Sequence, residues 1–262
     1  MELKPIISVK NLHFSYPKRE ILKGVDFELH RGEVVSLLGA NGCGKSTLIR
    51  LILGLIKGRG EIRIAQKPLQ SYSQKEIAQH IAYIPQYHNV PFNYSVVDMV
   101  VMGRIFKLGL FASPSQKDFA SAHEALEIIG IGELANHSFG ELSGGQKQMV
   151  LLARALAQGA KTFIMDEPVS GLDYGNQIRL LEMINTLSTH GYTFLKTTHY
   201  PDHALMVSSR VVVMHEGKII ADATPKEVIN NQMLEKIYGI NADIILHDGK
   251  QWVIPKLQNK QR

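Results

Sequence analysis

Residues 39–46 read Gly39-Ala40-Asn41-Gly42-Cys43-Gly44-Lys45-Ser46 and match the pattern G-x-x-x-x-G-K-[ST]. A short apolar segment, Glu33–Leu38, precedes this stretch, and a helical pattern follows it from Lys45 to about Leu55. A glycine-rich turn between a strand and a helix lets backbone N–H groups surround phosphate oxygens, and the helix N-terminus adds partial positive charge. The stretch therefore predicts a phosphate-binding loop in an α/β fold.

Several residues of this loop are expected to contact a bound nucleotide. Lys45 should reach the β- and γ-phosphates, and the Ser46 hydroxyl should ligate Mg²⁺. A glycine-rich turn that binds nothing is the alternative, and the strand before it and the helix after it argue against that explanation. The residues assigned to nucleotide binding in this segment are Gly39, Asn41, Gly42, Cys43, Gly44, Lys45, Ser46 and Thr47.

A second apolar segment ends in two carboxylates. Thr162–Met165 is a predicted strand, and Asp166 and Glu167 follow it directly. Ligands of open α/β sheets bind beyond the carboxyl ends of the strands. Asp166 is therefore expected to hold Mg²⁺, directly or through water, and Glu167 to accept a proton from the attacking water. A helix cap or a surface turn is the alternative explanation of this pair.

A third motif, Leu142-Ser143-Gly144-Gly145-Gln146, lies between the other two. It opens a predicted helix and offers a second anion site, the alternative being an ordinary glycine-rich helix start. With the three motifs in this order, the chain resembles the ATP-binding cassette (ABC) proteins from end to end. The resemblance implies an ATPase that uses ATP and Mg²⁺ as a head-to-tail homodimer. Ser143, Gly144, Gly145 and Gln146 of one chain would then contact the ATP that Lys45 of the other chain holds.

Smaller matches extend the resemblance over about 180 residues. It implies that Tyr16 stacks on adenine, that Gln86 senses Mg²⁺, and that His199 contacts the γ-phosphate. It also implies that the loop ending in Asp173 passes between the two ATP sites. The expected catalytic residues are Glu167, His199 and Gln86, and the expected metal ligands are Ser46, Gln86 and Asp166.

Two side chains leave alternatives open. Cys43, near a helix N-terminus and Lys45, is expected to have a lowered pKa and a reactive thiolate, unless its side chain points into the core and is inert. Lys196 lies in the predicted strand Thr193–Lys196, at a position that is usually apolar in such proteins. Either its stem extends to solvent or its ammonium group meets a partner.

Strand and helix patterns alternate along most of the chain, which favours a parallel sheet with helices on its faces. Residues 87–159 differ, because their pattern is mostly helical, with Ser115 as a predicted N-cap. We expect an α/β fold of the P-loop NTPase (RecA-like) type: a parallel-sheet core, an N-terminal antiparallel β subdomain and an inserted α-helical subdomain. The predicted division is a single ABC ATPase domain over 1–262, with a nucleotide-binding core at 1–86 and 160–240, the helical subdomain at 87–159, and a short C-terminal strand and tail at 241–262.

Composition excludes several other classes of protein. The 262 residues carry a net charge of +5, but the basic residues are scattered, so no nucleic-acid partner is expected. The single cysteine excludes an internal disulfide and a zinc site built from several thiols. Neither a secretory signal nor an apolar run of about 18 residues is evident, so the chain is expected to remain in the cytoplasm. A GTPase would usually carry an N-K-x-D motif, which the sequence lacks.

The stretch Asn93–Arg104 suggests which branch of the family is involved. Its run Val100-Val101-Met102-Gly103-Arg104 resembles importers of metal chelates, of the iron–siderophore, haem, cobalamin and molybdate or tungstate kind, although ordinary helix packing is the alternative. The resemblance implies partner transmembrane permease subunits, an extracytoplasmic substrate-binding protein acting indirectly, and a peripheral position on the cytoplasmic face of the bacterial inner (plasma) membrane. A zinc or manganese importer, an exporter, and a non-transport ABC ATPase remain alternatives.

Overall fold

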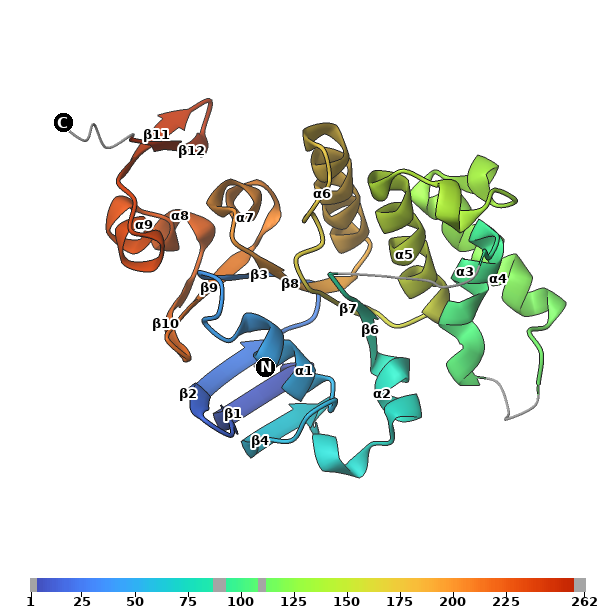
Figure 1. Cartoon of the computed structure of the whole chain (residues 1–262), viewed down its shortest axis with the longest axis horizontal. Helices are drawn as coiled ribbons and strands as arrows, with labels where there is room; N and C mark the ends of the chain where they lie inside the picture. Colours follow the sequence, from blue (N-terminus) through green and yellow to red (C-terminus); the bar gives the residue numbers. More distant parts are fainter. Residues whose placement is uncertain (1–3, 87–92, 108–111, 257–262) are drawn as a thin grey trace. The chain divides into compact units, whose positions relative to one another are not determined.

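The computed structural model describes residues 4–86, 93–107 and 112–256 and divides into two compact units (Figure 1). The first unit combines Met1–Leu69 with Leu195–Arg262, and the second is Gln70–Phe194. The predicted start of the helical subdomain, residue 87, and the last six residues of the predicted tail lie outside the described residues.

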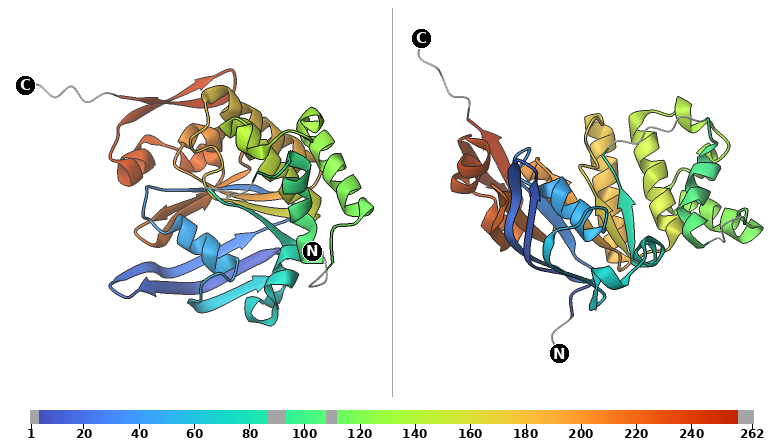
Figure 2. Two further views of the ribbon diagram at one scale, coloured as in Figure 1. Left: turned by 45° about the vertical axis from the view of Figure 1, so that its right-hand side comes forward. Right: turned by 60° about the horizontal axis from the view of Figure 1, so that its bottom comes forward.

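The N-terminal part of the first unit is an antiparallel sheet in the order β2-β1-β4-β5. The central strand β1 places Ile7 opposite Leu29 of β2 and Ile64 of β4, and all three side chains are buried. Helix α1, Lys45–Ile52, packs on this sheet (Figure 2). The strands are β1 (Ile7–Tyr16), β2 (Arg19–Leu29), β4 (Arg59–Ile64) and β5 (Lys67–Pro68).

A second group of strands in the first unit has the order β10-β9-β3-β8. Strand β3, Val34–Leu38, is fully buried and runs parallel to β9, with Val35 opposite Arg210. Because a strand with apolar contacts on both faces needs no polar alternation, the sequence of β3 is almost continuously apolar. The other strands are β8 (Thr193–Thr198), which starts in the second unit, β9 (Arg210–His215) and β10 (Lys218–Ala223).

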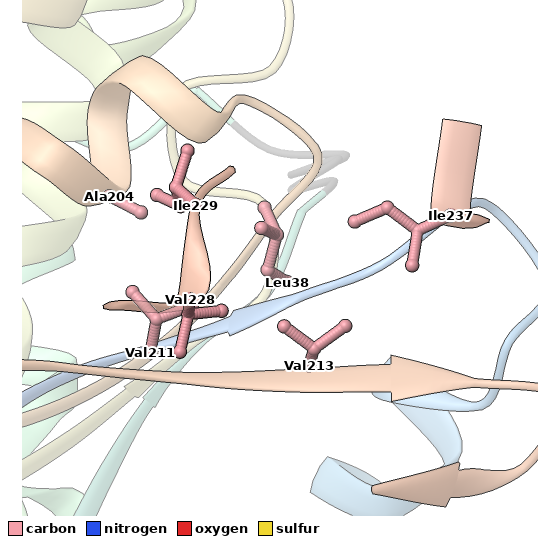
Figure 3. Packing of buried hydrophobic residues seen from close by; sticks show 7 residues of the cluster. All are labelled: Leu38, Ala204, Val211, Val213, Val228, Ile229 and Ile237. Atoms are coloured by element: carbon pink, nitrogen blue, oxygen red, sulfur yellow. The ribbon is translucent and has the colours of Figure 1, made fainter. Parts of the chain in front are cut away.

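The C-terminal helices cover one part of this group of strands. Leu38, Val211 and Val213 of the strands form a buried cluster with Ala204, Val228, Ile229 and Ile237 from the helical segments (Figure 3). Burying each large aliphatic side chain of this kind contributes about 1.5–3 kcal/mol. A hairpin of β11 (Ala242–His247) and β12 (Lys250–Pro255) adds Ile244 and Val253 to the cluster. The helices are α7 (Pro201–Val207), α8 (Pro225–Val228) and α9 (Asn231–Tyr238).

The second unit contains two parallel strands, β6 (Ile81–Ile84) and β7 (Thr162–Met165), with Ile81 opposite Thr162. The side-chain amide of Gln158, the last residue of α5, donates to the carbonyls of Ala78 and Ile81 at 2.7 and 2.9 Å. This contact ties the end of α5 to β6. Helices α2 (Gln74–His80) and α6 (Tyr174–Thr189) belong to the same unit.

Three helices of the second unit pack against one another: α3 (Val96–Val101), α4 (Gln116–Ile129) and α5 (Gly144–Gln158) (Figure 2). Each begins after a serine, Ser95, Ser115 or Ser143, whose hydroxyl accepts a backbone N–H of the first turn. Such caps satisfy donors that the helix itself leaves unpaired. Short 3₁₀ turns link the elements: η1 (Leu69–Ser71), η2 (Met102–Lys107), η3 (Gly132–Leu134) and η4 (Phe139–Glu141).

The expected fold class is confirmed, with parallel strands, an N-terminal antiparallel sheet and a helical insertion. The C-terminal end differs from the prediction, because it forms the hairpin β11–β12 rather than one short strand. The stem of Lys196 does not extend to solvent as one alternative held, since this residue is only 1% exposed. Over the described ranges, none of the helices combines the length and the hydrophobicity that a membrane crossing requires.

Candidate functional site

The phosphate loop follows the buried strand β3 and leads into α1. Its shape depends on two glycines. A Cβ atom at Gly39 would lie 2.3 Å from the Met214 carbonyl oxygen, so no larger residue fits. Gly44 has a φ of 115° and would place a Cβ atom 2.8 Å from Leu22. The loop therefore packs closely against β2 and β9. Backbone contact requires glycine at position 39, whereas at position 44 glycine is favoured by the positive φ and by the nearby side chain of Leu22.

Lys45 folds back over the phosphate loop. It is 5% exposed, and its Nζ donates to the Gly39 and Ala40 carbonyls at 2.7 and 3.2 Å. Helix α1 starts at Lys45 behind Gly44, and among the described residues no side chain caps its N-terminus. The serine-capped helices α3, α4 and α5 differ in this respect. A cation beside an uncapped helix start fits an anion such as a nucleotide phosphate.

Cys43 is buried, with 8% exposure, and this burial raises the pKa of its thiol. The positive charge of Lys45 and backbone hydrogen bonds act in the opposite direction, but desolvation has the larger effect. The expectation of a lowered pKa at Cys43 is therefore wrong, because the thiol faces the packed side of the loop. The inert-thiol alternative agrees with the structure.

The turn of the hairpin β9–β10 contacts the phosphate loop. Gly217, in its turn, donates its N–H to the Cys43 carbonyl at 3.2 Å and accepts from the Lys23 N–H at 2.9 Å. A Cβ atom at Gly217 would lie 2.2 Å from the Ile21 carbonyl oxygen. Sequence reasoning identified Glu216-Gly217 only as a turn. Its contact with the phosphate loop depends on a pairing across more than 170 residues, which no local pattern reveals.

Asp166 and Glu167 follow β7 in the second unit. Asp166 is 7% exposed, and its backbone N–H donates to the Ile84 carbonyl at 2.9 Å. Glu167 has a φ of 46°, a left-handed conformation that costs a non-glycine residue on the order of 1–3 kcal/mol. Strained residues of this kind concentrate at functional sites. The structure thus holds the two carboxylates in fixed, distinct positions at the end of the strand.

Gln86 lies beside Glu167, as its assignment to the same site requires. Its Nε2 donates to Glu167 Oε2 at 3.0 Å and to Ser170 Oγ at 3.4 Å. These residues come from three segments: the end of β6, the end of β7 and the turn after it. Ser170 was expected only as part of the loop that ends in Asp173, so its hydrogen bond with Gln86 was not predicted.

The Ser143 segment forms the start of α5. The Ser143 hydroxyl accepts the Gln146 N–H at 3.3 Å, and the Gln146 side chain accepts the Ser143 N–H at 3.0 Å. This reciprocal cap fixes the exposed turn at Ser143 and Gly144. Gly145 is buried, and a Cβ atom there would lie 2.2 Å from the Asn176 side chain. One glycine of the motif therefore serves close packing of α5 on α6.

Asp173 caps α6 in this structure. Its carboxylate accepts the backbone N–H of Asn176 at 2.9 Å and the side-chain amide of the same residue at 2.5 Å. These hydrogen bonds lower the pKa of Asp173. Asp173 is thus an ionised cap, and its location in an exposed loop is compatible with the predicted position between two sites.

His199 follows β8 in the first unit, in a row of three rings. The Tyr200 ring lies 4.1 Å from that of His199 and 4.8 Å from that of His203, measured between centroids. Burial, together with Lys196 and His199, lowers the pKa of His203 to about 4. Burial alone lowers the pKa of Lys196 to about 7. The neighbours of His199 were not predicted, because Tyr200 directly precedes α7 and His203 lies in it, and the sequence pattern did not reveal this short helix.

Tyr16 ends β1 with a ring that is 44% exposed and packs edge-on against Phe14, 4.9 Å between centroids. An exposed ring with a supported edge can stack on a planar base. The first unit thus carries Tyr16, the phosphate loop and His199. The second unit carries Gln86, Asp166, Glu167, the Ser143 segment and Asp173.

The run Val100–Arg104, which suggested a metal-chelate importer, has packing roles. A Cβ atom at Gly103 would lie 2.2 Å from the Arg154 carbonyl oxygen, so η2 and α5 touch through backbone. The Arg104 guanidinium donates to Asp118 at 2.6 Å and to the Ala157 carbonyl at 3.0 Å. Gly103 and Arg104 therefore hold the helical part of the unit together. Helix packing thus explains part of the sequence pattern that suggested a metal-chelate importer.

Comparison with known proteins places these features in one family. The family model described as ABC transporter matches residues 22–170. An ABC transporter ATP-binding protein of Haemophilus influenzae is 38% identical to this chain, over 92% of this chain and 92% of that protein. The molybdate import ATP-binding protein MolC of the same species is 37% identical, over 80% of this chain and 79% of MolC. An iron chelatin transport ATP-binding protein of Helicobacter pylori (strain 26695) is 35% identical, over 94% and 97%.

Solved structures agree with this assignment. A metal-chelate type ABC transporter in an inward-facing conformation contains a chain with a TM-score of 0.85 and 29% identity, over 97% of this chain and 99% of that one. A dimeric bacterial ABC transporter cassette matches with a TM-score of 0.72 and 26% identity, over 84% and 98%. The chain belongs to the ABC transporter family, as an ATP-binding subunit that couples ATP hydrolysis to transport.

Proposed function

We propose that this chain is the ATPase of an importer whose cargo is a metal chelate or an oxyanion, with iron–siderophore, haem, cobalamin and molybdate or tungstate as candidates. The observation that carries the ATPase is the phosphate loop, where Lys45 lies over an uncapped helix start. The cargo class rests on the named relatives, which import molybdate or transport iron chelatin, and on the metal-chelate type of the similar structure.

The residues of the chain fit ATP with Mg²⁺. In this proposal Tyr16 stacks on adenine, and Gly39, Asn41, Gly42, Cys43 and Gly44 supply backbone to the phosphates. Lys45 exchanges its two loop carbonyls for phosphate oxygens, while Ser46 and Thr47 lie in the uncapped first turn of α1. Such an exchange is favourable, because an ammonium group binds a phosphate anion more strongly than a neutral carbonyl.

The metal ligands proposed are Ser46, Gln86 and Asp166. Within the described ranges, no cluster of three or more His, Cys, Asp or Glu side chains could hold a metal ion. The three proposed ligands are a hydroxyl, an amide and a carboxylate. Such oxygen donors suit Mg²⁺, which is commonly held by one or two protein oxygens together with substrate phosphates and water. When bound, the ion supplies charge neutralisation at the phosphates.

Glu167 is proposed as the general base, with Gln86 and His199 as its partners in catalysis. The hydrogen bond from Gln86 Nε2 orients the carboxylate of Glu167, which would accept the proton of a water molecule. His199 would donate to the γ-phosphate. Its ring packs against that of Tyr200, which favours one orientation of the imidazole.

A head-to-tail homodimer is proposed to complete the site. The support is the exposed, rigidly capped turn at Ser143 and Gly144, with Gln146 as its internal partner, together with the likeness to a dimeric cassette. Ser143, Gly144, Gly145 and Gln146 of one protomer would approach the ATP of the other, and Asp173 would lie between the two sites. Two-fold symmetry then gives two ATP sites per dimer.

The proposed partners are transmembrane permease subunits, with a substrate-binding protein acting outside the membrane. The chain would lie peripherally on the cytoplasmic face of a bacterial inner membrane. It would dock through the helical subdomain, 87–159, while 1–86 and 160–240 form the nucleotide-binding core and 241–262 the C-terminal segment. A zinc or manganese importer, or an exporter, is the second candidate, because Gly103 and Arg104 have packing roles that are independent of cargo.

Uptake measurements test the cargo. Cells lacking this chain should lose uptake of one substrate among iron–siderophore, haem, cobalamin, molybdate and tungstate. Expression of the natural chain should restore it, whereas the Glu167→Gln variant should not. Normal uptake of all five, with loss of zinc, manganese or another solute, would overturn the cargo class and leave the ATPase unaffected.

A further inference from the structure

The backbone around His199 is restrained from both sides. The hydroxyl of the buried Thr198 accepts the Tyr200 N–H at 3.0 Å and closes a turn that spans His199. Pro201 follows as the first residue of α7, and Tyr200 has the extended conformation, φ −102° and ψ 107°, that a residue before proline favours. The backbone of Tyr200 therefore has little freedom, and the segment itself directs its side chain.

The ring of Tyr200 contacts two imidazoles. Its centroid lies 4.1 Å from that of His199 and 4.8 Å from that of His203, with interplanar angles of 39° and 43°. His203 is only 6% exposed, so one end of this row of rings lies in the interior of the unit. Contacts between aromatic rings favour particular relative orientations. Tyr200, which packs on His203, therefore restricts the rotation of the His199 imidazole.

Helix α7, which carries His203, is itself fixed to the strands of the unit. Ala204 is fully buried in the apolar cluster of Figure 3. Beyond the end of the helix, the Ser208 hydroxyl oxygen lies 2.6 Å from that of Ser36 in β3. Strand β3 leads into the phosphate loop. The helix behind Tyr200 is thus joined to the strand that positions the phosphate loop.

His203 supplies a ring contact and not a second charge. Its burial, with a smaller effect of the charges of Lys196 and His199, lowers the pKa of its imidazole to about 4. The ring is therefore neutral near pH 7. Its Nδ1 is shielded from solvent and has no hydrogen-bond partner among the described residues. These properties fit packing against Tyr200 and not proton donation to a ligand.

We propose that Tyr200 is a positioning residue, whose ring holds the imidazole of His199 in the orientation that contacts the γ-phosphate. This inference rests on the proposed function, in which His199 makes that contact. Tyr200 would act only through His199 and would not touch ATP. Loss of its ring should therefore reduce turnover and not the affinity for ATP, because the phosphate loop and Tyr16 hold the nucleotide.

Two substitutions separate the ring of Tyr200 from the bulk of its side chain. Tyr200→Leu keeps an apolar side chain without a ring, whereas Tyr200→Phe keeps the ring. Tyr200→Leu should lower kcat about 3–10-fold, as the loss of an aromatic contact predicts, with the KM for ATP within about two-fold of the natural value. Tyr200→Phe should keep the natural kcat. Met206→Ala, at an exposed position of the same helix, should change neither constant.

Removing His199 tests whether Tyr200 acts through it. In the His199→Ala background, Tyr200→Leu should cause no further loss of the residual kcat, because the effects of two residues that act as one unit do not add. A general loss of stability would instead lower kcat in both backgrounds.

NMR spectra of the chain without nucleotide provide a second readout. The imidazole C–H signals of His199 are assigned by their absence from the spectrum of His199→Ala. They should shift in Tyr200→Leu, where the neighbouring ring is missing, and keep their positions in Tyr200→Phe.

Three results would overturn the proposal: unchanged His199 signals in Tyr200→Leu, an unchanged kcat of this variant, or the same fold loss of kcat in the natural chain and in His199→Ala. If His199→Ala loses hydrolysis while Tyr200→Leu is normal, only the positioning role fails. If His199→Ala hydrolyses ATP at the natural rate, the role of His199 in the proposed function fails as well.

Discussion

Replacing Lys196 by methionine should stabilise the protein in a manner that depends on pH. Lys196 is only 1% exposed, and burial lowers the pKa of its ammonium group from 10.5 to about 7. The unfolded chain therefore binds this proton more tightly than the folded chain. Between pH 7 and 10.5 the unfolded state carries more protons, so the stability of the natural protein rises with pH through this window.

The size of this effect follows from the two pKa values. The reference is a chain in which residue 196 is neutral in both the folded and the unfolded state. Relative to it, the lowered pKa of Lys196 reduces the free energy of unfolding by about 4 kcal/mol at pH 7.5 and by about 1 kcal/mol at pH 10. The natural protein should therefore gain up to about 3 kcal/mol over this range, and Lys196→Met should lack this gain. The nearby His203, whose pKa is lowered to about 4, does not titrate in this range.

Denaturant unfolding followed by the fluorescence of Trp252 measures the effect, because Lys196 and Trp252 belong to the same unit. The free energy of unfolding is compared at pH 7.5 and 10 for the natural chain, Lys196→Met and a control, Lys218→Met, at an exposed position of β10. The control should follow the natural chain. A difference between natural chain and Lys196→Met that does not change with pH would refute the reasoning.

Two further predictions concern packing and reactivity. At pH 7.5 Cys43 should react with a maleimide far more slowly than a free thiol, because burial raises the pKa of its thiol. Mass spectrometry compares the labelling rate of the folded chain with that of the urea-unfolded chain, and equal rates would contradict the prediction. Gly145→Ala should lower the free energy of unfolding by about 1–3 kcal/mol, since its Cβ atom would lie 2.2 Å from Asn176. Gly171→Ala, whose Cβ atom has no neighbour within 4 Å but whose φ is 76°, serves as a control for backbone strain alone.

Motifs made of consecutive residues could be predicted from the sequence. The phosphate loop, the carboxylate pair after β7 and the Ser115 cap of α4 depend on local spacing, which determines their backbone conformation. The pairing of Gln86 with Glu167 could be anticipated only through the resemblance, because it joins positions 81 residues apart.

The remaining features depend on tertiary contacts that leave no local signal. The reactivity expected of Cys43 was wrong because neighbouring charge is visible in the sequence and burial is not. The helices α7 and α8 are only seven and four residues long, too short for a helical period to be recognised. The support that Gly217 gives to the phosphate loop likewise arises from a contact between distant segments.

The central claim, that Glu167 is the base of an ATPase, is tested most directly by the turnover of Glu167→Gln. This variant keeps the shape of the side chain and the neighbouring amide of Gln86, but it has no carboxylate to accept a proton. ATP hydrolysis should fall by roughly 10²–10⁴-fold while ATP still binds. Lys45→Ala should instead lose ATP binding, and Glu182→Gln, at an exposed position of α6, should hydrolyse ATP normally. Turnover of Glu167→Gln within a few-fold of the natural chain would contradict the account.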